Sequence, residues 1–336
     1  PAFAYGFCPH RRREQALLVK NVTTWKLRKL HLKTRHRTSG FSHNNSHRDI
    51  SNAFPSTSHQ SLDASMDKLF DPHTAALLKL RYTQTWTQIT TATGHKVIIQ
   101  PTQGGMQGDG AMPAMFASVY EPAAQDWITW KEHHLPSVLT AVDPFSKTVQ
   151  EVGTTLFADD VRELNLTPSV QDLCSVEAAS TKALDDRISP LQLAQNLSKS
   201  EHVAHFMGEG SVYNTHEAIQ RFRTEGRGQV VSHAKYLGNQ TQGDGSLTRT
   251  LTQHVSAAKE AYYAYIGFWQ RAAIPLSTKI HFFKMVFLST LITGLEGEVL
   301  SHFEIRKLDI VFIPVSYTHL RAHETDSYLV CRLLLE

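Results

Sequence analysis

Apolar residues recur every three or four positions along much of the chain, a spacing that predicts amphipathic helices. The first such run is Ala16, Val19, Val22 and Trp25. Basic residues such as Lys20 fall largely on the other side of this predicted helix. Further helices are predicted in the middle of 61–93, from 112 onward, over 170–197, and in two segments between 246 and 294. The last two indicate a separate helical subdomain.

Short runs of strand-forming residues alternate with these helices. They lie at 95–100, 154–166, 200–207 and 232–240. Within 154–166, the sequence TTLFADDVRELNL predicts a strand, a tight turn and a second strand. The segment around Asp49 is bounded by turn-forming residues and closed by Pro55, so no strand is predicted there.

The composition is that of a globular protein. Of 336 residues, 41% are hydrophobic and 19% charged, enough for a sizeable core in one large domain or two to three subdomains. No apolar run is long enough to span a bilayer, so we expect no membrane partner. Cys8, Cys174 and Cys331 show neither zinc-ligand nor disulfide spacing, which favours an intracellular compartment, nuclear or cytoplasmic.

Positive charge is concentrated near the N-terminus. Residues 1–50 contain 11 Lys or Arg and two acidic residues, a net charge of +9 against −6 for the remainder. Such a block indicates a polyanionic partner, and a solvated helix face would show the same pattern.

Two adjacent carboxylates, Asp159 and Asp160, end the apolar run TTLF. Like charges at this spacing repel unless a divalent cation lies between them. Two such ions about 4 Å apart can activate a hydroxyl and neutralise a departing pyrophosphate, as nucleotidyl transfer requires. Magnesium takes oxygen ligands, and a few carboxylates with substrate phosphates suffice. A hairpin turn with two solvated acids is the alternative.

Four further motifs accompany FADD (157–160) in order along the chain. They are RDISNAF (48–54), GGMQGDG (104–110), NLSKSE (196–201) and KYLG (235–238). In order and spacing, the five resemble the palm motifs of the reverse transcriptases of non-LTR (LINE-type) retrotransposons, over roughly residues 5–300. The resemblance implies an α+β fold with a right-hand polymerase palm, an antiparallel sheet backed by helices, plus partial fingers and a helical thumb.

The resemblance also implies a catalytic site. Asp49, Asp159 and Asp160 match the family's metal-binding carboxylates, with Mg²⁺, or alternatively Mn²⁺, as the expected cofactor. Lys199 matches a lysine near the position proposed as general acid for pyrophosphate. A surface lysine would look the same in the sequence.

Four residues match the family's nucleotide-binding positions. The carbonyl of Ile50 is expected beside the metal site. Phe54 falls where the family places an aromatic gate against the ribose 2′-hydroxyl, although an ordinary core aromatic would look alike. Gln107 and Gly108 resemble the loop beneath the incoming nucleotide and the template base.

The remaining matches concern nucleic acid. The family's turn that grips the primer end is matched by Lys235, Tyr236, Leu237 and Gly238. An ordinary strand–loop–strand would have the same sequence pattern. Arg11 falls on the second arginine of the family's finger segment. The expected partners are an RNA template, a DNA primer and dNTPs.

Several positions depart from the family pattern. Cys8 and Met106 each stand where arginine is usual, and Gly110–Met112 replace Pro-Leu-Ser. Arg162 and Glu163 lie in a strand that the family makes more apolar, and the sequence does not explain them.

The predicted organisation has partial fingers with a basic helix over 1–42, a palm with inserted finger elements over 43–240, and a helical thumb over 241–305. Residues 306–336 are a tail that, from about 314, resembles a translated sequencing adapter. We expect a fragment of a retroelement RNA-directed DNA polymerase. The alternatives are a catalytically dead remnant that binds nucleic acid and a maturase-like relative.

Overall fold

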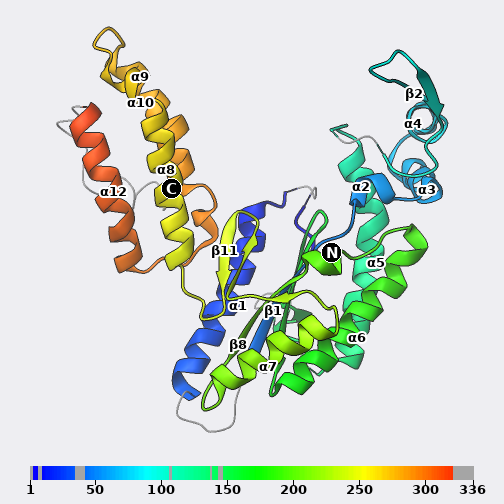
Figure 1. Cartoon of the computed structure of the whole chain (residues 1–336), viewed down its shortest axis with the longest axis horizontal. Coiled ribbons are helices and arrows are strands. Elements are labelled where there is room, and N and C mark those ends of the chain that lie inside the picture. The colour runs from blue at the N-terminus through cyan, green and yellow to red at the C-terminus, as the bar shows by residue number, and fades with distance from the viewer. Residues whose placement is uncertain are drawn as a thin grey trace.

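A five-stranded sheet forms the centre of the computed structural model, which describes residues 3–6, 10–34, 42–105, 108–136, 138–142 and 147–320 (Figure 1). The strand order is β6–β7–β1–β8–β9. Neighbouring strands pair antiparallel, except that β8 and β9 are parallel. The strands are β6 (Thr154–Phe157), β7 (Asp160–Thr167), β1 (Ser42–Arg48), β8 (Glu201–Phe206) and β9 (Gln229–Val230).

Both faces of this sheet are covered. Helices α5 and α6 pack on one face, with α7 beside α6 and β8, and helix α1 and the hairpin β10–β11 lie against the other (Figure 1). The hairpin is attached through Tyr236, whose hydroxyl hydrogen-bonds the Thr155 hydroxyl of β6 at 2.8 Å. These elements are α1 (Arg13–Thr34), α5 (Met112–His134), α6 (Val170–Ile188), α7 (Ser211–Thr224), β10 (His233–Tyr236) and β11 (Asn239–Gln242).

Short elements surround this core. They are α2 (Ala53–Ser56), α3 (His59–Leu69), α4 (Pro72–Tyr82), β2 (Thr87–Thr90), β3 (Lys96–Ile99), β4 (Thr140–Val142) and β5 (Val149–Glu151). Helices α3 and α4 pack beside α5 (Figure 1). The hairpin β2–β3 is solvent-exposed along its whole length.

A helical region follows the hairpin β10–β11 and has its own apolar cluster, centred on Phe287, Leu291 and Leu308. Its elements are α8 (Thr248–Ala264), α9 (Ile266–Gln270), α10 (Leu276–Phe283), a π-helical turn (Lys284–Leu288), α11 (Ser289–Ile292), a 3-10 turn (Leu295–Gly297) and α12 (His302–Leu320). Within the described residues, no helix is long and apolar enough to cross a membrane. The predicted α+β class is confirmed, with a mainly antiparallel sheet backed by helices.

Most predicted elements are present, and one is shorter than expected. The helix predicted over 170–197 ends at Ile188. Pro190 lies in the 3-10 turn Ser189–Leu191 that follows, and Gln192 then adopts a left-handed φ of 62°. Proline removes a backbone donor and the left-handed residue reverses the chain, so the helix cannot continue.

Strand β1 was not predicted, and it lies in the middle of the sheet. Its sequence, SHNNSHR, has no apolar residue, yet all seven positions are buried. Buried polar groups are tolerated only where hydrogen bonds or ion pairs compensate for lost water. The prediction failed because it relied on apolar alternation, which this strand lacks.

On the face of the sheet that packs against α5 and α6, a buried ion-pair network compensates the polar side chains of β1 for the water they have lost. Arg48 contacts Glu163 of β7 at 2.9 Å and Glu177 of α6 at 2.7 Å. Lys131 of α5 reaches Glu163 at 3.2 Å. The Ser46 hydroxyl donates to Glu177 at 2.5 Å. Burial alone would raise the pKa of Glu163, but the charges of Lys131 and Arg48 outweigh it and lower that pKa.

Helix α1 exposes part of the face that was predicted to be buried. Val22 and Trp25 are 36% and 47% exposed, whereas Lys20 is 3% exposed. The Lys20 ammonium lies 3.7 Å from a carboxylate oxygen of Glu298, just before α12. With Lys20 buried in this ion pair, the buried side of α1 differs from the side that the apolar spacing predicted. Lys20 is therefore not available to contact a phosphate.

Candidate active site

The Asp pair lies at the tight turn between β6 and β7, as predicted, with Asp159 in the turn and Asp160 at the start of β7. Phe157 pairs with Asp160, so Ala158 and Asp159 form a two-residue turn. Ala158 has a φ of 57°, a left-handed conformation that costs a non-glycine residue about 1–2 kcal/mol. Strained turns of this kind concentrate at functional sites.

The N-terminal segment holds this turn in place. Leu156 of β6 exchanges backbone hydrogen bonds with Phe3 and Tyr5, at 2.9 and 2.8 Å. A Cβ placed on Gly6 would lie 2.2 Å from the amide nitrogen of Ala158. Only glycine therefore permits this approach, and the backbone of residues 3–6 packs directly behind the two aspartates.

Asp49 follows β1 directly, at the end of the strand that pairs with β7. Its carbonyl accepts a 2.8 Å hydrogen bond from the amide of Asn196, and the amide of Ser51 donates to Ala194 at 2.8 Å. Two motifs far apart in the chain, RDISNAF and NLSKSE, are therefore joined by their backbones.

The three aspartates influence one another electrostatically. The surrounding protein withdraws Asp159 and Asp160 from water, which raises the pKa of each carboxyl. The charge of Asp49 raises both pKa values further. Asp159 adds to the effect on Asp160, whose pKa reaches about 6. The end of the sheet thus holds negative charge that no cation of the described residues fully neutralises.

Lys199 lies close to this charge. Its ammonium is 3.6 Å from Asp49, with the two side chains 70% and 31% exposed. An ion pair with this much solvent contact is weak, so Lys199 remains free to move to another anion.

The described residues contain no group of three or more His, Cys, Asp or Glu side chains already arranged as a metal cage. The charge of Asp49 raises the pKa of Asp159 and Asp160, but the three side chains do not form such a cage in the described residues. Carboxylates with unneutralised charge still fit a divalent cation chemically, because an ion would relieve their repulsion.

The nucleotide-side residues differ in their surroundings. Ile50 is 2% exposed and belongs to the main apolar cluster. Phe54 is half-buried and packs on Phe116, with ring centroids 5.0 Å apart. Gly108 is exposed, and a Cβ there would meet nothing within 4 Å. Gln107 lies outside the described residues.

Contacts of the glycine-rich loop were not foreseen in the sequence. The amides of Gly104 and Gly105 donate to the carbonyls of Thr57 and Phe54, at 2.7 and 3.1 Å. A Cβ on Gly104 would lie 2.2 Å from the carbonyl oxygen of Pro55. The adjacent glycines were the only signal of this close approach, which joins the loop to the segment carrying Phe54.

An ion pair fixes the far end of the same loop. Asp109 contacts Arg81 of α4 at 2.7 Å and accepts a 2.9 Å hydrogen bond from the amide of Ala111. Nothing in the sequence paired these residues, because they lie 28 positions apart without a common motif.

The KYLG segment forms the turn of the hairpin β10–β11. Leu237 and Gly238 have φ values of 50° and 93°, which the two-residue turn requires. Lys235 is exposed, but Tyr236 is 3% exposed and its ring contacts His47 of β1. Tyr236 therefore anchors the hairpin to the sheet.

The side chain of Arg11 contacts other residues of the N-terminal segment. Its guanidinium donates to the carbonyl of Ala4 at 2.8 Å and lies 5.3 Å from the ring centre of Tyr5. It positions the segment behind the Asp turn.

Comparisons with known proteins give only distant matches. No family model matches the chain, and no curated protein does. Among solved structures, apo telomerase from Candida tropicalis aligns with a TM-score of 0.48 at 10% identity, over 99% of this chain and 50% of that chain. Telomerase from Candida albicans in complex with a TWJ fragment of telomeric RNA aligns with a TM-score of 0.45 at 10% identity, over 94% and 52%. The chain thus spans about half the length of these structures.

The α+β architecture rests on the chain's own sheet and helices, not on these alignments. The site likewise rests on its own geometry, in which motifs from four parts of the sequence meet at one end of the sheet.

Proposed function

We propose that this chain is an RNA-directed DNA polymerase domain of the LINE-type class. The observation that carries the proposal is the convergence of Asp49, Asp159 and Asp160. These carboxylates come from segments 110 residues apart, at the ends of paired strands, and the charge of Asp49 raises the pKa of both Asp159 and Asp160. Such crowding of like charge is unfavourable unless a divalent cation joins it.

In this proposal the three aspartates would hold Mg²⁺ or Mn²⁺. When bound, the metal supplies charge neutralisation and lowers the pKa of an attacking hydroxyl. Strands β1 and β7 orient the carboxylates, and the strained Ala158 turn fixes the direction of Asp159. Lys199 would exchange its contact with Asp49 for the leaving pyrophosphate and donate a proton to it.

The side chains around the site would select and place the substrates. Phe54 is held by Phe116, so its ring is fixed rather than free to rotate away from a ribose. Gly108 leaves open space for a nucleotide to approach the loop. Lys235 is exposed at the hairpin, where it would contact a primer phosphate.

The test is Mg²⁺-dependent extension of a DNA primer on an RNA template, with Mn²⁺ binding measured by electron paramagnetic resonance as a second readout. Asp159→Ala should abolish extension and weaken Mn²⁺ binding at least about tenfold, because one ligand and one charge are lost. Asp186→Ala is the matched control, since this exposed aspartate pairs with Lys182 on the outside of α6.

Equal extension and equal Mn²⁺ binding in Asp159→Ala and the parent chain would refute the proposal. The second candidate is a chain that binds nucleic acid without polymerising. It is favoured because the described residues contain no three side chains already arranged to hold a metal ion. Salt-dependent RNA binding without nucleotide incorporation or Mn²⁺ binding would select it.

A further inference from the structure

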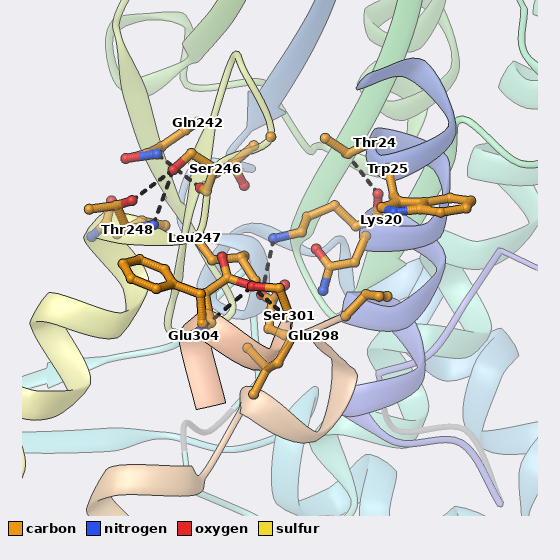
Figure 2. Close-up of a pocket in the computed structure, with 17 residues that line it drawn as sticks. Lys20, Thr24, Trp25, Gln242, Ser246, Leu247, Thr248, Glu298, Ser301 and Glu304 are labelled. Atoms are coloured by element: carbon orange, nitrogen blue, oxygen red, sulfur yellow. Dashed lines mark hydrogen bonds and ion pairs between the residues drawn. The ribbon is translucent and has the colours of Figure 1, made fainter. Parts of the chain in front are cut away.

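A cavity of about 460 Å³ lies between α1, β11 and the segment 298–304 (Figure 2). Trp25 comes from α1, Gln242 from β11, Thr248 from the start of α8 and Phe303 from the start of α12. Among the described residues, none that we assign to the polymerase reaction lines this cavity. Its volume falls within the usual range of small-molecule sites, so it can take a group of the size of a nucleotide.

Two aromatic rings are the large groups that this cavity presents to solvent. Trp25 is 47% exposed and Phe303 is 68% exposed. The charged side chains of Lys20 and Glu298 lie behind the wall, at 4% and 1% exposure, so a bound group does not reach them. An exposed ring offers a face on which a nucleobase can stack, whichever base it is.

A lysine ammonium lies near each of these rings. The Nζ atom of Lys29 is 5.3 Å from the ring centre of Trp25, and that of Lys307 is 4.7 Å from the ring centre of Phe303. Contacts between an ammonium and a ring are weak where solvent reaches them, so each lysine can turn to a phosphate beside a stacked base. The two ring–lysine pairs, Trp25–Lys29 and Phe303–Lys307, therefore combine base stacking with phosphate binding.

The basic block near the N-terminus supplies part of this charge. Lys20 of this block is buried against Glu298, whereas Lys26 and Lys29 are exposed on α1. Trp25 is exposed beside them. A merely solvated helix face has no use for an exposed tryptophan among its lysines, but a surface that stacks bases requires one. The polyanionic partner that the sequence indicates therefore fits this side of α1.

The polar side chains of the wall bond to groups of the wall itself. The hydroxyl of Ser246 lies 2.9 Å from that of Thr248, and the Gln242 amide donates to the Ser246 carbonyl at 2.9 Å. Across the cavity, the Ser301 hydroxyl donates to Glu304 at 2.7 Å. Discrimination between bases needs donors and acceptors that only the correct base completes, whereas stacking tolerates any base. This wall is therefore suited to bases of every kind.

We propose that this cavity, with the two ring–lysine pairs, binds single-stranded nucleic acid without regard to sequence. A duplex does not make the same contacts, because its bases are already stacked on one another. Single strands of RNA and of DNA share the bases and the phosphates, so either can be the ligand. The proposal stands on the exposed rings and lysines beside the cavity, and it does not require polymerase activity.

The first experiment measures fluorescence anisotropy of labelled uridine and thymidine oligomers of about 15 nucleotides, in EDTA so that no metal at the aspartates contributes. Trp25→Ala and Phe303→Ala should each weaken binding about fivefold or more, because one stacking surface is lost. Tyr213→Ala is the matched control, since Tyr213 is 70% exposed on α7 and does not line the cavity. Equal affinities in the three variants, or no binding by the parent chain, would overturn the proposal.

Tryptophan fluorescence gives a second readout, which a folding defect would not reproduce. A base stacked on Trp25 should quench the fluorescence of that ring. Trp25→Phe should keep the affinity within about threefold, since phenylalanine also stacks, and should lose this quenching. Quenching of the same size in Trp25→Phe and the parent chain would place the strand elsewhere and contradict the proposal.

Salt dependence tests the lysines. Lys29→Gln should reduce the slope of log K against log salt concentration by about 0.7, the contribution of one phosphate of a single strand. Lys182→Gln is the matched control, since Lys182 is 81% exposed on α6 and pairs with Asp186. Equal slopes in the two variants would show that Lys29 contacts no phosphate and would contradict the proposed site.

Competition identifies the class of ligand. The unlabelled oligomer, uridine or thymidine, that displaces the labelled strand at the lower concentration identifies RNA or DNA as the ligand. A duplex of the same length and a poly-glutamate peptide should compete at least about tenfold less well, since neither offers a free base face. Equal competition by either of them would show that charge alone accounts for binding and would overturn the proposal. Because extension is not measured, these results can contradict the single-strand site while the polymerase proposal stands.

Discussion

At the level of single residues, the most informative group is Asp160. Withdrawal from water and the charges of Asp159 and Asp49 raise its pKa from 3.8 to about 6. The folded chain thus binds this proton more tightly than the unfolded chain does. The resulting stabilisation is fully present below about pH 4 and is lost as the pH rises through about 6. The site therefore becomes less stable, and more receptive to a cation, over the same pH range.

This linkage gives a pH prediction. The affinity for Mn²⁺ should rise between about pH 5 and pH 7 and then level off, because the cation competes with the proton on Asp160 until that carboxyl is ionised. Titrations followed by electron paramagnetic resonance would measure it. Asp160→Asn should bind Mn²⁺ more weakly and with a flatter pH dependence.

Asp186→Asn serves as the control, since Asp186 is exposed on α6, pairs with Lys182 and is not among the charges that shift the pKa of Asp159 or Asp160. It should reproduce the pH dependence of the parent chain. A Mn²⁺ affinity that does not change with pH in the parent would show that Asp160 does not ligate the ion.

At the level of elements, strand β1 and its neighbours form a mutually dependent set. Arg162 and Glu163 of β7 have no explanation in the sequence, but the structure provides one for each. Glu163 binds Arg48 of β1, and Arg162 donates to the Asn45 side chain of the same strand at 2.6 and 3.1 Å. The polar residues Arg162 and Glu163 of β7 are therefore the partners of polar residues in β1.

Removing one member of this network should be severe. Arg48→Met leaves Glu163 and Glu177 buried without their shared partner, which should lower the free energy of unfolding by about 3–5 kcal/mol. Urea titration followed by circular dichroism would measure it. Arg81→Met is the matched control: Arg81 also pairs with an aspartate at 2.7 Å, but it is 57% exposed.

The control should change the free energy of unfolding by no more than about 1 kcal/mol, because solvent already screens that pair. Similar losses in both variants would mean that the Arg48 contacts contribute no more than a surface ion pair.

The same network explains what could be predicted from the sequence. The Asp turn and the order of the motifs could be predicted from short stretches of sequence, since apolar runs and glycines mark strands and turns directly. Strand β1 could not be found that way. Its seven polar residues have partners 115 to 200 positions away, such as Glu163 and Gly243, and no local pattern encodes those pairs.

Helix α1 shows the same limit in a different form. Its apolar spacing predicted the helix correctly but not which side is buried, because the ion pair of Lys20 with Glu298 spans 278 positions. That Asp49 lies near the Asp turn could be predicted only from the resemblance to LINE-type reverse transcriptases. Geometry adds the effect of Asp49 on the pKa values of Asp159 and Asp160, the Gly104–Pro55 contact and the burial of Glu298 against Lys20, none of which has a local signal.

At the level of the whole molecule, the two larger apolar cores share no residue among those the structure describes. One lies between the sheet and helices α3, α5 and α6, and the other lies within α8–α12. Helix α1 connects them, since it packs on β6 and its Asn21 side chain donates to the carbonyl of Gly297 at 2.6 Å.

The two cores should therefore lose stability separately. Phe287 is fully buried and its ring centroid lies 4.8 Å from that of Phe283, so Phe287→Ala should destabilise the helical region by about 3–5 kcal/mol. Hydrogen exchange followed by mass spectrometry should then rise in α8 and α10–α12 while β7, β1 and β8 keep their protection. Leu62→Ala, at an equally buried site in the other core, should give the opposite distribution. If Phe287→Ala instead accelerated exchange equally in the central strands, the junction at α1 would couple both cores into one cooperative unit.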